Sequence, residues 1–225
     1  MTVKICASVT ARTLKEVKQM AKKAERDGAD LLEIRVDYAR EQYSLDEIRK
    51  LSGLPMIATN RASCEGGMFK GSEEERISQL FAAADADFDF ADVELSTKGS
   101  KEILRKLTNT GTSTIVSIHI FDTADLPTLK SVFKKELRCH TDVCKIVALA
   151  QEFKDNLECL RFLGEASKKT DVACFCTGEL GLTSRLISPL FGGCFTYAAV
   201  ERGKEAAKGQ LTVSEMRSFY EVLGV

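Results

Sequence analysis

Short apolar runs alternate with longer amphipathic runs along the whole chain. The short runs are rich in β-branched and small residues, which is typical of strands buried on both faces of a parallel sheet. The predicted strands are Val3–Val9, Leu31–Asp37, Met56–Arg61, Phe90–Ser96, Ser113–Ile120, Asp142–Ala150, Val172–Thr177 and Phe195–Val200. The longer runs repeat their apolar residues with the period of an α-helix. The predicted helices are Leu14–Arg26, Leu45–Leu51, Glu73–Ala84, Lys101–Leu107, Leu126–Leu137, Phe153–Lys168, Leu182–Leu190 and Ser214–Leu223.

This alternation predicts an α/β fold. Eight strand–helix units in 225 residues leave about 28 residues for each unit, which is close to the minimum for a (β/α)₈ barrel. An open doubly wound sheet is the alternative, but it often carries a glycine-rich turn after its first strand, where this chain has Ser8-Val-Thr-Ala-Arg12. We therefore predict a single domain over residues 1–225, folded as a TIM barrel. Aspartates just before four strands predict polar turns at its bottom: Asp30, Asp89, Asp142 and Asp171.

Polar residues recur in one phase of several strands. In the second strand Glu33, Arg35 and Asp37 alternate with apolar residues. The helices around a barrel need the apolar side, so the charged side should point inward. On an open antiparallel sheet the same alternation would be a solvated face. The same phase places these pairs on inner faces: Thr59 with Arg61, Asp92 with Glu94, and Ser117 with His119. Polar side chains from neighbouring strands are thus predicted to meet in one cavity.

Lys145 lies inside the apolar run Asp142–Ala150. A buried ammonium group costs several kcal/mol unless it is partnered, and burial disfavours the charged form, which makes a lysine nucleophilic at neutral pH. The alternative is a lysine near a strand end whose head group reaches solvent. The neighbouring strand favours the first interpretation, because His119 stands there within reach as a general acid or base.

Two polar loops follow strands of the predicted barrel. The first, Asn60–Gly67, contains Glu65, which could orient a histidine, although a flexible polar loop would look the same. The second follows the seventh strand, where its glycines resemble the usual phosphate-binding position of barrels. It leads to Arg185, one turn into a helix, where a guanidinium group could instead bind a carboxylate through two hydrogen bonds. His119 considered alone has another interpretation besides a general acid or base, because a histidine can also hold a loop in place by hydrogen bonds.

Composition limits the classes of function. The chain is 44% hydrophobic and 29% charged with a net charge of −1, so neither nucleic acid nor a membrane is an expected partner. No apolar run is long enough to span a membrane, and no signal-peptide pattern is present, so we expect a cytoplasmic protein. Eight scattered cysteines are expected to be reduced thiols. The nearest approach to a metal motif, Cys139-His140 with Cys144, fits no standard zinc spacing.

Six short motifs follow one another along the chain. They are Glu33-Ile-Arg-Val-Asp37, Arg61-x-x-x-Glu65-Gly-Gly67, Ser117-Ile-His119-x-Phe121, Lys145-Ile-Val-Ala148, Gly181-x-x-Ser184-Arg185 and Gly209-Gln210. In this order they make the chain similar to type I 3-dehydroquinate dehydratases, the Schiff-base-forming enzymes of the shikimate pathway. The resemblance covers essentially the whole chain.

The resemblance implies an enzyme that eliminates water in syn fashion from 3-dehydroquinate, giving 3-dehydroshikimate. Lys145 would form an imine with the substrate ketone, His119 would transfer the protons, and Glu65 would position His119. Arg185 would bind the substrate carboxylate. The other implied substrate contacts are Ser8, Glu33, Arg35, Arg61 and Gln210. The resemblance also implies a homodimer formed through outer helices of the later units, and we expect neither a metal nor a cofactor.

Some positions depart from the family pattern. Ile120 stands where an aspartate often follows the histidine, and Thr177 stands where methionine is frequent. The loop before Gln210 reads Ala206-Ala-Lys208 and lacks a serine substrate contact. Two other functions remain open from the residues alone: a Schiff-base class I aldolase on the same barrel, and a non-catalytic small-molecule-binding barrel. The aldolase would more naturally need a phosphate site, and the binding barrel gains no stability from a buried amine.

Overall fold

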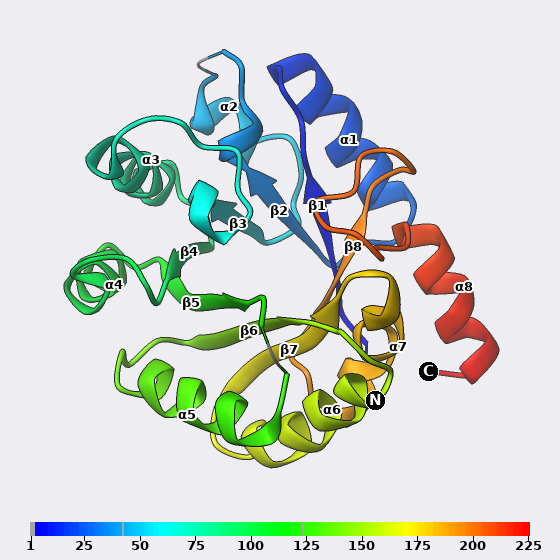
Figure 1. Ribbon diagram of the computed structural model, residues 1–225. Coiled ribbons are helices and arrows are strands. Elements are labelled where there is room, and N and C mark those ends of the chain that lie inside the picture. The colour runs from blue at the N-terminus through cyan, green and yellow to red at the C-terminus, as the bar shows by residue number, and fades with distance from the viewer. Residues whose placement is uncertain (1–2, 42, 123) are drawn as a thin grey trace.

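The computed structural model describes residues 3–41, 43–122 and 124–225, and it shows the predicted barrel. All neighbouring strands pair in parallel, in the order β7-β6-β5-β4-β3-β2-β1-β8. Near the two end strands, the backbone N–H of Cys194 donates to the Val172 carbonyl at 3.0 Å, so the sheet curves back on itself (Figure 1). The strands are β1 Ile5–Val9, β2 Leu31–Arg35, β3 Met56–Thr59, β4 Phe90–Glu94, β5 Ser113–Ile120, β6 Val143–Leu149, β7 Asp171–Thr177 and β8 Thr196–Ala199.

The helices surround the sheet (Figure 1). They are α1 Leu14–Arg26, α2 Leu45–Arg49, α3 Glu73–Asp85, α4 Ser100–Asn109, α5 Leu126–Leu137, α6 Lys154–Ala166, α7 Leu182–Ile187 and α8 Val213–Leu223. The predicted bounds of α1, α5 and β5 are confirmed at both ends. Local chemistry explains the sharp starts of α1 and α5, because the side chains of Thr13 and Asp125 accept hydrogen bonds from backbone N–H groups of the first turn.

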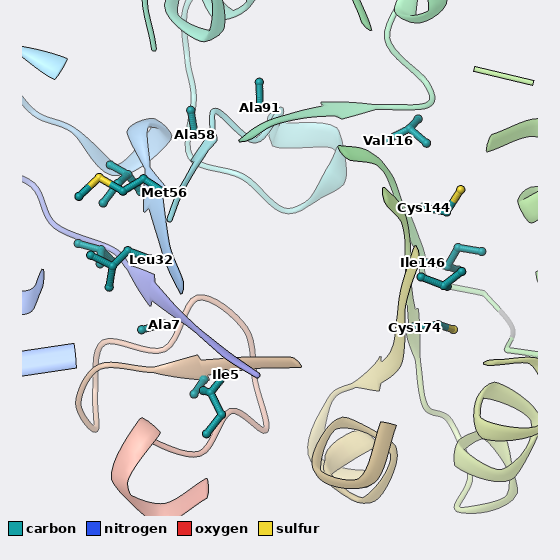
Figure 2. Close-up of a cluster of buried hydrophobic side chains, with 14 of the residues drawn as sticks. Ile5, Ala7, Leu32, Met56, Ala58, Ala91, Val116, Cys144, Ile146 and Cys174 are labelled. Atoms are coloured by element: carbon teal, nitrogen blue, oxygen red, sulfur yellow. The ribbon is translucent and has the colours of Figure 1, made fainter. Parts of the chain in front are cut away.

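The main hydrophobic core lies between the sheet and the helices. Alternate strand residues point outward from the barrel into this layer, as Figure 2 shows for Leu32, Ala58, Val116 and Ile146. The opposite phase points inward. At the N-terminal ends of the strands this inner phase is apolar and includes Leu31, Ile57, Ile115 and Val143. Towards the C-terminal ends of the strands the inner phase becomes polar. The interior of the barrel is therefore packed with apolar side chains at the N-terminal ends of the strands and lined by polar side chains at their C-terminal ends.

The polar turns predicted at the bottom of the barrel are present at three positions. The carboxylates of Asp30, Asp89 and Asp142 accept hydrogen bonds from the backbone N–H groups of Ile5, Met56 and Thr114, at 2.7, 2.8 and 2.7 Å. Each bond satisfies a donor at the start of a strand, where the sheet itself supplies no partner.

The predictions were wrong at several element ends. Strand β2 stops at Arg35, and Asp37 lies in a 3₁₀ helix, Val36–Tyr38. In this position the Asp37 carboxylate can turn back and bind both Nε and Nη2 of Arg35, at 2.8 and 2.7 Å. Strands β3 and β4 also end two residues early, so Arg61 belongs to the loop after β3. The predicted helix Leu182–Leu190 breaks after Ile187 into a 3₁₀ helix, because Pro189 cannot continue an α-helix.

Candidate active site

Lys145 points into the barrel from the middle of β6 and is buried, with 4% of its surface exposed. Its Nζ lies 2.9 Å from Oδ2 of Asp92 and 3.2 Å from Oε1 of Glu33. The ring of Tyr197 lies beneath the same nitrogen, at 4.2 Å from its centroid. The lysine is therefore buried and partnered, and it does not reach the solvent.

The two carboxylates next to Lys145 are held by hydroxyl groups. Glu33 accepts hydrogen bonds from Ser8 at 2.9 Å and Thr59 at 3.0 Å. Burial by itself would raise the pKa of Glu33, but the charges of Lys145 and Arg35 outweigh it and lower that pKa below its usual range. Hence Glu33 is an anion in the free protein.

Asp92 is the second anion beside the lysine, and it also binds β5 and the loop after β3. Its Oδ1 accepts a hydrogen bond from Ser117 at 2.5 Å, and its Oδ2 accepts one from Nη2 of Arg61 at 2.8 Å. Burial would raise the pKa of Asp92, but Arg61 and Lys145 lower it well below its usual range. Asp92 thus joins Arg61 and Lys145 in one buried ion cluster.

His119 and Glu65 form a pair at the edge of this cluster. Nδ1 of His119 lies 3.2 Å from Oε2 of Glu65, and the backbone N–H of His119 donates to the same oxygen at 3.2 Å. The hydroxyl of Ser96 donates to the other oxygen of Glu65. Burial and the charge of Arg61 lower the pKa of His119 to about 4, although the hydrogen bond that its ring donates to Glu65 acts in the opposite direction. The imidazole is therefore neutral at pH 7. A neutral ring that donates from Nδ1 keeps its lone pair on Nε2.

Three arginines surround the cavity, and their pairing differs. Arg35 is bound by Asp37, and Nη1 of Arg61 lies 3.1 Å from Glu94 in addition to its bond to Asp92. Arg185, at 2% exposure, has no hydrogen-bond partner for Nε or Nη2 among the described residues.

Arg185 packs on an aromatic ring instead. Its guanidinium carbon lies 4.4 Å from the centroid of the Phe175 ring. Burial lowers the pKa of Arg185 to about 10. A guanidinium group that is charged, buried and unpaired is poised to bind an anion.

These side chains line one cavity of about 280 Å³. All nine residues predicted as the site contribute to its wall: Ser8, Glu33, Arg35, Arg61, Glu65, His119, Lys145, Arg185 and Gln210. The structure therefore brings together every predicted site residue. Among the residues that it describes, no group of three or more His, Cys, Asp and Glu side chains is placed to hold a metal ion. Within the same residues no helix is long and apolar enough to cross a membrane.

The loop before Gln210 forms part of the cavity wall. Oε1 of Gln210 accepts hydrogen bonds from the backbone N–H groups of Ala206 at 2.7 Å and Ala207 at 3.3 Å. Lys208 follows, and its carbonyl accepts a bond from the backbone N–H of Gly178 at 3.2 Å. Gln210 therefore holds the loop with its carbonyl oxygen, which leaves the amide nitrogen for other contacts.

Three functional contacts had not been predicted from the sequence. Asp92 and Ser117 were placed on the inner faces, but nothing in a single sequence shows that Asp92 would pair with Lys145. The ring of Tyr197 lies in an otherwise apolar strand, so it gave no signal. Arg76 of α3, buried behind the loop after β3, stands in the polar run Glu73-Glu-Glu-Arg76, which looks like a solvated helix face.

Known proteins match the chain over almost its full length. The family model described as type I 3-dehydroquinase matches residues 5–225. The 3-dehydroquinate dehydratase of Dehalococcoides mccartyi is 36% identical over 217 residues, which cover 96% of this chain and 94% of that protein. The enzyme of the same name from Methanothermobacter thermautotrophicus is 37% identical over 222 residues, which cover 96% of each chain.

Solved structures show the same relationship. The crystal structure of 3-dehydroquinate dehydratase from Geobacillus kaustophilus superposes with a TM-score of 0.92 at 26% identity, covering 100% of this chain and 92% of that chain. A 3-hexulose-6-phosphate synthase, at 14% identity and a TM-score of 0.61, shares only the fold. The family model and the curated relatives together show that this chain belongs to the type I 3-dehydroquinase family.

Proposed function

We propose that this chain is a 3-dehydroquinate dehydratase that forms an imine between its substrate and Lys145. One observation carries the proposal. A single cavity holds a buried amine, a neutral histidine bound to a carboxylate, and a buried guanidinium group without a hydrogen-bond partner for Nε or Nη2 among the described residues. These are the groups needed to bind an anionic ketone, activate it and move its protons. An aldolase or a binding barrel does not require this set, and the family assignment favours neither.

The first step is formation of the imine. The ammonium group of Lys145 passes a proton to a neighbouring carboxylate, and Glu33 and Asp92 both lie within hydrogen-bond distance. The free amine then adds to the ketone carbon C3 to give a carbinolamine. Its hydroxyl group takes the proton back from the carboxylate and leaves as water, which gives a protonated imine. The positive charge stays on the same nitrogen, so both carboxylates remain paired with it.

The second step is elimination. Neutral His119 takes the proton from C2, and the electron pair of that C–H bond moves toward the protonated imine to give an enamine. The C1–O bond then breaks, and the departing hydroxyl takes a proton from His119 and leaves as water. Hydrolysis of the imine releases 3-dehydroshikimate and restores Lys145. Glu65 holds the imidazole in one orientation throughout.

Substrate binding is assigned to the cations and polar groups of the wall. We assign the substrate carboxylate to Nε and Nη2 of Arg185, because these two donors are buried and have no partner among the described residues. Ser8, Glu33, Arg35, Arg61 and Gln210 are proposed contacts for hydroxyl groups and the ring. Because the loop Ala206–Lys208 has no serine, we assign the polar contact of this part of the wall to the amide nitrogen of Gln210, whose carbonyl oxygen holds the loop.

The test is intact-mass measurement after incubation with 3-dehydroquinate and sodium borohydride, followed by peptide mapping. We expect a reduced adduct on Lys145, and Lys145→Ala should lose both the adduct and turnover measured by the absorbance of the enone product. His119→Ala should still form the imine slowly, with elimination nearly stopped. Lys208→Ala is the matched control, because Lys208 lines the same cavity and its loss should leave the adduct intact. Normal turnover in Lys145→Ala would refute the mechanism.

The state of the protein in the cell is also a proposal. We propose that residues 1–225 form one catalytic domain, since one sheet takes up strands from β1 to β8, and that two copies form a homodimer. We propose a cytoplasmic location, supported by eight cysteines that are all free. Size-exclusion chromatography with light scattering tests the dimer, because a monomeric mass at micromolar concentration would contradict it.

A further inference from the structure

Arg76 is a buried arginine on α3 that does not line the cavity. Its exposure is 1%, and all three nitrogens of its guanidinium group are used. Nη1 donates to Oε2 of Glu94 at 2.6 Å and to the carbonyl of Asn60 at 2.7 Å. Nη2 donates to Thr97 at 2.8 Å, while Nε and Nη2 both bind Glu73. Such a fork fixes its partners in position more strongly than a single ammonium group does.

Arg76 is one member of a row of alternating charges that ends at the reactive amine. The row begins at half-exposed Glu73, and each contact is 3.1 Å or shorter. Its members, in order of contact, are Glu73, Arg76, Glu94, Arg61, Asp92 and Lys145. Because the inner members are all buried, a change of charge at one place is weakly screened at the next.

Arg76 also fixes both ends of the segment that leads to Glu65. On one side it binds the carbonyl of Asn60, directly before Arg61. On the other side it binds Glu94, whose Oε1 accepts a hydrogen bond from the backbone N–H of Ala62 at 3.0 Å. The short 3₁₀ helix Ser63–Glu65 starts at the next residue. The place of Glu65 beside His119 thus depends on a guanidinium group behind the loop.

We propose that Arg76 is a positioning residue for the dehydratase reaction, which fixes Arg61 and Glu65 around His119 through Glu94 and the backbone of Asn60. The expected effect of Arg76 on turnover rests on the proposed function. The expected effect of Arg76 on the pKa of His119 in the free protein does not.

The charged groups around His119 give the direction of the effect. Arg61 and Lys145 lower the pKa of His119, and Glu65 raises it. Asp92 and Glu94 of β4 lie behind Arg61, and the other charged groups of the cavity wall are Glu33, Arg35, Arg185 and Lys208. Loss of the Arg76 charge leaves Glu94 balanced by Arg61 alone, so the potential at His119 becomes more negative. The pKa of His119 should then rise.

The experiment is an NMR titration of the histidine rings in the full chain. The chain has only two histidines, and exposed His140 serves as an internal reference in the same spectrum. Arg76→Met should move the midpoint of His119 upward and leave that of His140 unchanged. Arg76→Lys keeps the charge without the fork, so the midpoint of His119 should not rise, and it should fall where Glu65 loses contact with the ring. Arg217→Met is the matched control, because Arg217 binds Asp30 and the carbonyl of Gly28 at the opposite end of the barrel.

Kinetics give the second measurement. Both Arg76 variants should lower kcat by about tenfold to a hundredfold with a smaller change in KM, as expected when catalytic groups are displaced by a distant substitution. Arg217→Met should lower the melting temperature without changing kcat or the titration. An unchanged His119 midpoint in folded Arg76→Met, or a wild-type kcat in Arg76→Lys, would overturn the proposal. If Arg76→Met does not fold, the kcat of Arg76→Lys decides alone. An inactive wild-type protein would refute the proposed function, and the titration would still test Arg76.

Discussion

Replacement of Arg185 by methionine should stabilise the free protein and weaken substrate binding. The guanidinium group is buried, and neither Nε nor Nη2 has a partner among the described residues. Burial lowers the pKa of Arg185 from its ordinary 12.5 to about 10. At ~1.4 kcal/mol for each pKa unit, this lowering corresponds to roughly 3 kcal/mol against the charged form. Methionine keeps most of the aliphatic volume and carries no charge, so this cost disappears.

The expected gain in the free energy of unfolding is about 1–3 kcal/mol, because contact with the Phe175 ring already offsets part of the cost. The expected loss in substrate binding is about 2–5 kcal/mol, since a desolvated bidentate pair is removed. Urea denaturation of the free protein measures the first quantity. The rise in KM, read from enone absorbance, measures the second. The two effects should have opposite signs for the same substitution.

Two controls make this prediction specific. Arg202→Met removes an exposed arginine that pairs with Glu215, and it should change neither stability nor KM by a measurable amount. Arg185→Lys keeps the charge but not the fork, so KM should still rise. A less stable Arg185→Met protein would show that the guanidinium group has a compensating partner. An unchanged KM would show that Arg185 does not bind the carboxylate.

Three further predictions follow from the same site. The pKa of His119 is lowered to about 4, so the ring stays neutral down to that pH and kcat/KM should fall only below about pH 4. A pH profile of kcat/KM that already falls near pH 6.5, in protein that stays folded, would contradict this. The pKa of Asp92 is lowered below its ordinary 3.8, so its ion pairs add to stability above about pH 4. That stability is lost as the pH falls further, and wild type should lose more of it than Asp92→Asn in parallel urea titrations. Finally, Gly209→Ala should raise KM, because φ is +81° and a new Cβ would lie 2.4 Å from the Gly178 carbonyl; Gly203→Ala, also at +81° but in open space, should leave KM unchanged.

The barrel and the inner polar face could be predicted because both depend on a period that a single sequence shows. Strand residues alternate between the two faces, so the apolar phase of β2 and β5 identified the side that faces the helices. The residues of the opposite phase were then assigned to the inner face of the barrel, among them Glu33, Thr59, His119 and Lys145. The ends of strands depend on tertiary contacts instead. Strand β2 stops before Asp37 because that carboxylate accepts hydrogen bonds from Arg35 and from the backbone N–H of Met68, and Met68 lies in another loop.

The partners of the inner side chains could not be predicted, because strand register and side-chain reach are set by the closed barrel. Lys145 lies beside Ser117 and Ala173 in the sheet, yet it binds Asp92 and Glu33 from strands farther round the barrel. Arg76 shows the same limit, since its neighbours in sequence are glutamates typical of an exposed surface.

The pairing of Lys145 changes the physical account of its reactivity. The sequence suggested an amine activated by burial in apolar surroundings, but the structure surrounds Nζ with two anions and an aromatic ring. The two carboxylates lie within ion-pair distance of that nitrogen, at 3.2 and 2.9 Å. In the proposed mechanism that nitrogen carries a positive charge in the protonated imine, which must draw electrons from C2. The site is therefore complementary to the iminium state rather than to a free amine, and it needs little rearrangement to stabilise that state. The same proposal assigns the substrate carboxylate to Arg185, whose Nε and Nη2 have no hydrogen-bond partner among the described residues.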